Sequence, residues 1–200
     1  MLSRSGGVAC TPLVRGEADL SERDPTAKLL PSTNDHHSPT AWTEARSRLA
    51  DAESYWLTTV RPDGRPHVAP LLAVWHEGAL HFVANRSTRK ARNLIHDRRV
   101  VMAAATADSH LVVEGLAARV TDEAQLKRLA ALYVAKYQWS TDVRDSALWG
   151  DGAPTSGGPP YDVYKLTPTT VFGFGTDETF SPTRWTFSKT SERRATGRSR

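Results

Sequence analysis

The chain has 200 residues, of which 39% are hydrophobic and 24% charged, and it holds six Trp, five Tyr and five Phe residues. This content supports one domain with a core and excludes a fully disordered protein. No apolar run approaches the roughly 20 residues that a membrane-spanning helix needs, and the single Cys excludes an intramolecular disulfide, so we expect a cytoplasmic protein without a membrane partner.

The net charge of +4 is concentrated in short stretches of the chain. The last twelve residues hold five Lys and Arg residues against one Glu, so the rest of the chain is neutral overall. Within that rest, six Lys and Arg residues against one Asp lie between residues 85 and 99. We therefore expect no nucleic-acid partner, although a barrel that binds nucleic acid through residues 85–99 and the tail is an alternative.

The two ends of the chain differ in composition from the middle. Residues 1–37 contain no aromatic residue and no hydrophobic periodicity, which predicts a disordered leader. Residues 189–200 predict a basic disordered tail. The folded domain is expected over residues 38–188, beginning with a helix that has Ser38 as its N-cap and extends to about Ala52.

Five β-rich runs separated by turn signals follow this helix. Pro62-Asp63-Gly64 and Glu77-Gly78 both predict hairpin turns. The five predicted strands, in meander order, cover residues 55–61, 65–76, 79–84, 99–106 and 110–120.

Between the third and fourth of these strands, the sequence "NRSTRKARNL" predicts a helix with Ser87 as its N-cap. Ala91, Leu94 and Ile95 would share its apolar face. Its first turn holds Arg89 and Lys90, although cations are unfavourable at the positive end of a helix dipole. A bound anion would make them favourable, whereas the alternative is a solvated basic face.

A second clear helix is predicted from the cap Thr121 to Tyr137, and a long Gly- and Pro-rich loop over residues 138–160. The apolar face of this helix comprises Leu126, Leu129, Ala130, Tyr133 and Tyr137. The last strands are expected in "YDVYKLTP" and "TVFGFG". Short antiparallel strands with few helices predict a mainly β fold, a small barrel.

Few residues carry recognisable catalytic chemistry. Gly173 and Gly175 precede no helix, and the chain has neither a phosphate-binding P-loop nor a nucleophile elbow. His67, His76 and His81 have no acidic residue at a suitable spacing, so we expect no metal. The catalytic residues are unknown from the sequence, and a bound cofactor is expected to supply the reactivity.

The ordered segments "WLTTVRPDGRPHVAPLLAVW", "GALHFVANRSTRKARNLIHDRRVVMAA", "LVVEGLAARVTD" and "TRWTF" resemble the FMN-binding split-barrel family related to pyridoxamine 5′-phosphate oxidase. Within it, the branch that uses the deazaflavin coenzyme F420 is the most similar. The resemblance covers about residues 42–187. It implies an antiparallel split β-barrel of six to seven strands and a homodimer with the cofactor, F420 or FMN, in the groove between subunits.

The resemblance also implies roles for particular residues. Arg89 and Lys90 would clamp the cofactor phosphate, with a hydroxyl from Ser87 or Thr88 beside it and Asn93 one turn on. The other implied cofactor residues are Pro70 and Leu71 along the ring, Ala84 and Asn85 before the clamp, and Trp185 over the ring or the substrate pocket. Packing is the alternative for Pro70, Leu71 and Trp185.

The implied function is F420-dependent hydride transfer to a small organic substrate. An FMN-dependent enzyme like pyridoxamine-phosphate oxidase and a non-catalytic FMN- or F420-binding protein are the alternatives. Arg86, Arg92 and Arg99 could meet an acidic polyglutamate tail, which favours the deazaflavin. The "TRWTF" segment is followed only by a basic tail and lacks the Arg-x-Trp segment of the oxidases, which argues against vitamin synthesis.

Overall fold

The structure is a computed structural model that describes residues 23–31, 38–151, 157–176 and 180–188. Over these ranges the chain forms eleven strands and three helices, and every strand pairing is antiparallel. The helices are α1 (Trp42–Asp51), α2 (Arg89–His96) and α3 (Glu123–Tyr137). The predicted mainly β, antiparallel fold is therefore confirmed, although the described residues form eleven strands where six to seven were expected.

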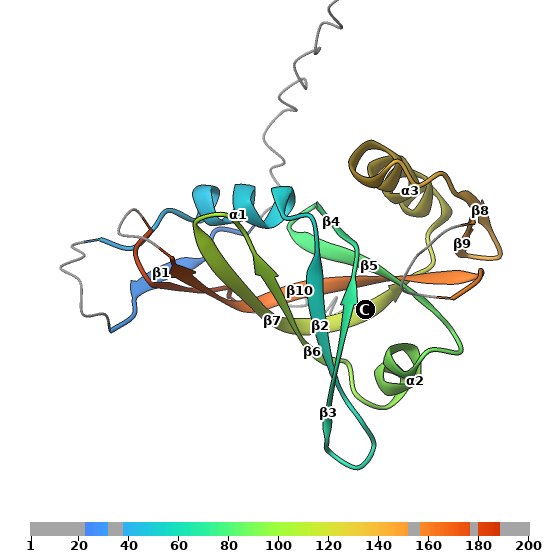
Figure 1. Cartoon of the computed structure of the whole chain (residues 1–200), viewed down its shortest axis with the longest axis horizontal. Coiled ribbons are helices and arrows are strands. Elements are labelled where there is room, and N and C mark those ends of the chain that lie inside the picture. The colour runs from blue at the N-terminus through green and yellow to red at the C-terminus, as the bar shows by residue number, and fades with distance from the viewer. Residues whose placement is uncertain (1–22, 32–37, 152–156, 177–179, 189–200) are drawn as a thin grey trace, which may run out of the picture.

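One sheet contains all the strands, and its main path runs β1-β11-β10-β7-β6-β2-β3 (Figure 1). The pair β4–β5 and the pair β8–β9 both join this path at β10. The strands are β1 (Thr26–Leu29), β2 (Tyr55–Val60), β3 (Pro66–Leu71), β4 (Ala73–His76), β5 (Ala79–Asn85), β6 (Arg99–Ala105), β7 (Ser109–Val120), β8 (Asp142–Arg144), β9 (Ala147–Trp149), β10 (Tyr161–Gly175) and β11 (Thr183–Thr186).

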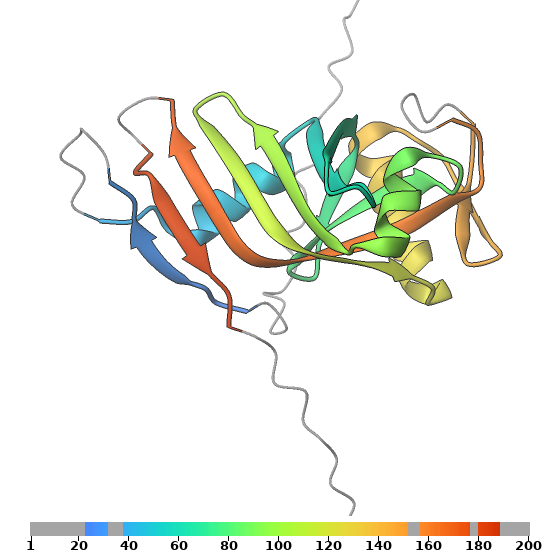
Figure 2. The same cartoon turned by 90° about the horizontal axis from the view of Figure 1, so that it is seen from below.

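Strand β10 is common to both parts of the sheet. Its first half pairs with β5 and its second half with β11, while β7 runs along its other edge from Val163 to Gly175. The register shifts between Pro168 and Thr170, where proline removes a ladder donor. The two predicted strands of this region are therefore one bulged strand, which divides the sheet into the two parts seen in Figure 2.

The predicted strand over residues 65–76 is also divided, at Leu72. Its first part, β3, pairs with β2, whereas its second part, β4, pairs with β5. The two hairpin turns are confirmed, since Gly64, Glu77 and Gly78 all have positive φ. The break at Leu72 takes the chain from one part of the sheet to the other.

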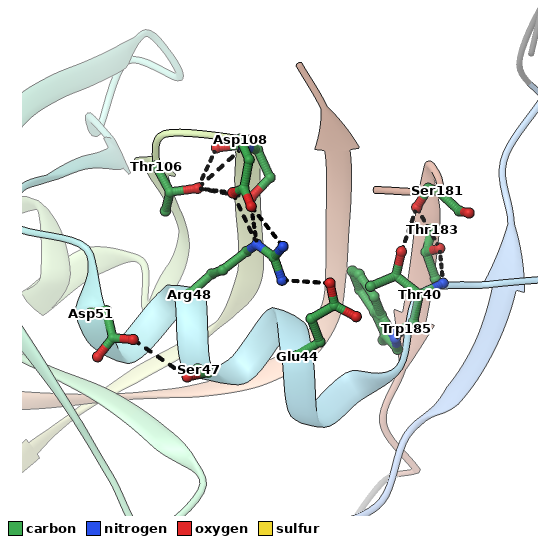
Figure 3. A network of polar contacts seen from close by, with 11 residues as sticks. Thr40, Glu44, Ser47, Arg48, Asp51, Thr106, Asp108, Ser181, Thr183 and Trp185 are labelled. Carbon is green, nitrogen blue, oxygen red and sulfur yellow. Dashed lines mark hydrogen bonds and ion pairs between the residues drawn. The ribbon is translucent and has the colours of Figure 1, made fainter. Parts of the chain in front are cut away.

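The N-cap of helix α1 is Ala41, three residues later than the predicted cap. The Thr40 N–H donates to Thr183 Oγ1 at 2.9 Å and its hydroxyl to the Ser181 carbonyl at 3.1 Å, while the Trp185 indole donates to the Thr40 carbonyl (Figure 3). These bonds keep the segment from Ser38 extended, so the prediction of Ser38 as the cap is wrong. The helix buries Trp42, Ala45 and Leu49 in the core.

A polar network ties α1 to the turn between β6 and β7. The Arg48 guanidinium donates to both carboxylate oxygens of Asp108 and, at 2.7 Å, to Glu44 one turn earlier. Thr106 also donates to the Asp108 carboxylate, at 3.1 Å. The network fixes the closed end of the β6–β7 hairpin against the helix (Figure 3).

The predicted disordered leader is wrong for Thr26–Leu29, which form β1 beside β11. Arg23 extends this contact by donating to the Pro168 carbonyl at 2.8 Å. Residues 1–22 and 32–37 of the leader and the predicted tail lie outside the described residues. A strand of four residues is stable only through its neighbour, which explains why no local pattern indicated it.

Helix α3 has the predicted end and the predicted buried face, with Tyr137 half-buried at the last turn. Its N-cap is Asp122, whose carboxylate accepts from the Gln125 N–H at 2.7 Å, and not Thr121. The predicted loop over residues 138–160 is wrong where β8 and β9 form a short hairpin. This hairpin and α3 enclose a second, smaller core.

Candidate cofactor site

Helix α2 follows β5 and begins after a hydrogen-bonded turn. Asn85 Oδ1 accepts from the Ser87 N–H at 2.7 Å and from the Ser87 hydroxyl at 2.6 Å. The cap is Thr88, whose Oγ1 accepts from the Ala91 N–H, so the prediction of Ser87 as the N-cap is wrong by one residue. Arg89 is consequently the first helical residue.

The helix is held against β2 by a polar side chain. Asn93 is buried and donates from Nδ2 to Thr59 Oγ1 at 2.9 Å. Ala91 and Leu94 are buried as predicted, but Ile95 is 79% exposed, so its place on the apolar face was predicted wrongly. The buried face of α2 instead includes Lys90.

Lys90 is 3% exposed, which is unusual for a lysine without a counter-charge. Within the described part of the chain, it forms neither a hydrogen bond nor an ion pair. Burial lowers the pKa of Lys90 from its ordinary value. The Lys90 ammonium is not among the fully buried atoms that lack a partner, so the stem is buried while the nitrogen keeps contact with solvent. An anion supplied from outside the chain would be favourable there.

Three further basic side chains gather at the same place. His67 on β3 lies in the electrostatic field of Arg61, Arg89 and Lys90, and burial together with these cations lowers its pKa. The buried atoms Arg61 Nε and His67 Nδ1 have no hydrogen-bond partner among the described residues. We call Arg61, His67, Arg89 and Lys90 the cationic cluster.

Other basic residues near α2 are already neutralised. Arg86 donates to Asp162 at 2.9–3.1 Å, and this buried carboxylate also pairs with Arg119 at 2.8 Å. Arg99 pairs with Asp97 at 2.6 Å. Arg86 and Arg99 are therefore not the open cations that the sequence suggested.

The residues predicted along the cofactor ring, Pro70 and Leu71, and those predicted before the clamp, Ala84 and Asn85, lie in different environments. Pro70 is exposed on β3, opposite Trp56 of β2. Leu71 and Ala84 are buried in the core, with 2% and 0% of each residue exposed, so in this structure neither offers a surface to a ligand. Asn85 also donates from Nδ2 to the Gly158 carbonyl and thus holds the turn before α2.

Trp185 belongs to the core. Its side chain is 0% exposed and packs against Trp42 and Phe180, with ring centroids 5.8 and 6.3 Å apart. Its indole nitrogen donates to the Thr40 carbonyl at 3.1 Å. The prediction that Trp185 covers the cofactor ring is therefore corrected in favour of packing.

The face of the sheet that carries Pro70 is apolar and exposed. It contains a concavity of about 420 Å³ lined by Val60, Val101, Leu116 and their neighbours on β2, β6, β7 and β10. Four exposed large hydrophobic residues lie on the outward side of these strands and β3, and we call the surface around them the outer sheet face: Trp56, Val68, Leu116 and Phe174. An apolar patch of this kind is typical of an interaction surface.

Two kinds of feature are absent over the described ranges. No helix there is long and apolar enough to cross a membrane. No group of three or more His, Cys, Asp or Glu residues in the same ranges is placed to hold a metal ion.

Comparison with known proteins gives one family match and several structural likenesses. A profile of the family described as pyridoxamine 5′-phosphate oxidase matches residues 41–174. None of the curated proteins compared matches the chain.

Three solved structures illustrate the likeness of fold. A protein of unknown function from Agrobacterium tumefaciens has 22% identity and a TM-score of 0.53, over 68% of this chain and 56% of that one. A conserved hypothetical protein from Mycobacterium tuberculosis has 16% identity and a TM-score of 0.53, over 68% of this chain and 85% of that one. A heme-binding protein from Mycobacterium smegmatis has 21% identity and a TM-score of 0.51, over 70% and 55%. The chain thus spans little more than half of the first and third proteins.

Proposed function

The chain belongs to the pyridoxamine 5′-phosphate oxidase family, and from this membership we propose that it binds a phosphate-bearing flavin-type cofactor and acts as an oxidoreductase. The observation that carries the proposal is Lys90, a lysine with a buried stem whose ammonium has no partner among the described residues. It lies in the first turn of α2, where free N–H groups and the helix dipole also favour an anion. The cofactor phosphate would occupy this place.

The residues present fit such a group. Arg89 and Lys90 would hold the phosphate, while Thr88 and Asn85 fix the start of the helix that carries them. Strand β3 ends the main path of the sheet, so one of its edges has no strand partner in the described ranges. Pro70, which is exposed on that strand, would lie against the ring, with Leu71 packed behind it in the core. The cofactor would supply the hydride chemistry, and the chain would position it and exclude water.

We propose coenzyme F420 or FMN as the cofactor, with hydride transfer to or from a small organic substrate. F420 is supported by Arg92, an exposed cation one turn after the cluster that could meet an acidic tail. FMN is supported by the concentration of three cations and a helix N-terminus on one point, which suits a doubly charged phosphate.

We also propose that two copies of the chain form a homodimer through the outer sheet face. Its exposed apolar residues and the concavity beside Leu116 would be covered by the same face of a second copy. The open edge of β3 borders this face, so the ring would lie in a groove between the subunits. The dimer would then complete the cofactor site.

The proposal is tested by separate absorbance titrations of the purified protein with FMN and with F420. We expect one of them to bind at micromolar concentration and, in its reduced form, to be oxidised by a compound from a panel of enones, quinones and tetrapyrroles. Binding without turnover would favour a non-catalytic carrier. Failure of both cofactors to bind would contradict the proposed function.

A further inference from the structure

His67 belongs to the cationic cluster, but the proposed function does not use it. Its carbonyl lies 3.4 Å from Thr59 Oγ1, the hydroxyl that also accepts from Asn93 of α2. Strand β3 is thereby linked through β2 to the helix. His67 is also paired directly with Thr59 in the sheet, so its side chain lies on the same sheet face as the Thr59 hydroxyl that contacts α2.

The charged groups that face the imidazole are all cations. They are Arg61, which follows β2, and Arg89 and Lys90 of α2. Strand β3 itself, Pro66–Leu71, holds no other charged residue. Burial first, and then these cations, keep the pKa of His67 below its ordinary value of 6.5, so the ring is neutral at pH 7.

A neutral imidazole among three cations has an unused capacity for hydrogen bonding. The Nδ1 atom of His67 is buried and has no partner among the described residues. A protonated ring donates from both nitrogens, whereas a neutral ring donates from only one. An anion held by Arg89 and Lys90 would reverse the field at His67 and offer oxygen atoms as acceptors.

We propose, on the basis of the proposed phosphate site, that His67 is a further ligand of the anion and takes up one proton from solvent when the anion binds. The proton is added to a ring nitrogen, and no covalent bond of the ligand is formed or broken. Between the pKa of His67 in the anion-bound protein and its pKa in the free protein, the affinity for the anion therefore rises as the pH falls, by up to about tenfold per pH unit.

The ligand's own titration must be separated from that of His67. A phosphate monoester has a second pKa near 6, so it releases protons when it binds as the dianion, which opposes the uptake by His67. Sulfate does not titrate near neutral pH, so any proton uptake that accompanies sulfate binding comes from the protein. Sulfate is therefore the first probe.

The first experiment follows the His67 imidazole by NMR as a function of pH, in sulfate and in chloride at equal ionic strength. The His67→Gln variant assigns the signal, and His110, exposed on β7, reports general salt effects. We expect sulfate to move the His67 titration to higher pH and to leave that of His110 in place. An unchanged His67 titration overturns the proposal.

The second experiment measures FMN and F420 binding by calorimetry at pH 6 and pH 8, in buffers with different ionisation enthalpies. We expect the wild type to take up close to one proton more than His67→Gln, and the variant to lose severalfold more affinity at pH 6 than at pH 8. A cofactor that binds both proteins with equal proton counts overturns the role of His67 while the proposed function stands. If neither cofactor binds, the proposed function fails, and the sulfate titration still decides the role of His67.

Discussion

At the scale of single residues, buried groups without a partner mark where this chain departs from a simple core. Lys90 lies in the candidate site, whereas His81 on β5 lies under α3, away from it. His81 is fully buried, and neither ring nitrogen has a hydrogen-bond partner among the described residues. Lys90 indicates a ligand site, whereas His81 indicates a cost in stability. A binding experiment tests the first, and an unfolding experiment tests the second.

Replacing Lys90 with Met retains much of the buried stem and removes the charge. We expect the affinity for the phosphate-bearing cofactor to fall about 10- to 150-fold, since a charge-assisted hydrogen bond contributes about 1.5–3 kcal/mol. The free energy of unfolding of the ligand-free protein should not fall, because burial disfavours the charged form of Lys90. Riboflavin, which has no phosphate, should bind both proteins equally, and an equal loss for riboflavin would contradict the phosphate assignment. Lys127→Met is the matched control, because the Lys127 side chain is 65% exposed on α3, away from the cationic cluster.

His81 predicts a pH dependence of stability. Burial, Lys165 and His76 lower its pKa to about 3, so the folded protein binds fewer protons there than the unfolded chain. The free energy of unfolding should therefore decrease as the pH falls from about 6.5 towards 3, by up to about 1.4 kcal/mol per pH unit. Urea unfolding at pH 7 and pH 4.5 measures this, and His81→Phe should show the smaller decrease. Equal decreases for the two proteins would show that other groups dominate acid unfolding.

At the scale of elements, local signals located most helices, strands and hairpin turns, but pairings between distant segments decided their ends. Ser87 and Thr88, like Thr121 and Asp122, are adjacent residues that both make good caps, so the sequence did not distinguish them. Strand β1 was missed because its pairing with β11 spans most of the chain. Arg89 and Lys90 could be predicted as a phosphate site because they lie in one continuous segment of the sequence. Arg61 and His67 could not, because only the contact between α2 and the β2–β3 hairpin brings them close to that site.

Strand β1 is expected to stabilise the fold although it is short. It pairs with β11 from Thr26 to Leu29, and Arg23 lies 5.3 Å from the centre of the Phe187 ring. Deleting residues 1–31 should lower the melting temperature by several degrees relative to deleting residues 1–22, since about 1 kcal/mol corresponds to roughly 2–4 °C at this size. Differential scanning calorimetry compares the two proteins. Equal melting temperatures would show that β11 does not depend on β1.

At the scale of the whole molecule, two features follow from the arrangement of the sheet. The outer sheet face leaves large apolar side chains exposed around a concavity, and the helix start with the cationic cluster borders the open edge of β3. The sequence did not reveal this face, because alternating residues on four separate strands form it only after pairing. Assembly and cofactor binding are therefore expected to depend on each other.

Leu116→Glu tests the proposed dimer. Leu116 is 47% exposed and lines the concavity, so a carboxylate there should disfavour burial against a second copy. Sedimentation at micromolar concentration should show a dimer for the wild type and a shift to monomer for the variant, with weaker cofactor binding. Val134→Glu is the matched control, because Val134 is 42% exposed on α3, outside the outer sheet face. A wild-type monomer that binds cofactor would contradict the proposed dimer.

The double pairing of β10 has a consequence for local opening. Because β5 and β11 follow one another along the same edge and β7 covers the other, neither part of the sheet can open completely without removing partners from β10. The amides of β10 on both sides of Pro168 should therefore exchange with deuterium at similar, slow rates that approach the rate set by global unfolding. Along this strand the two parts of the sheet would open as one cooperative unit.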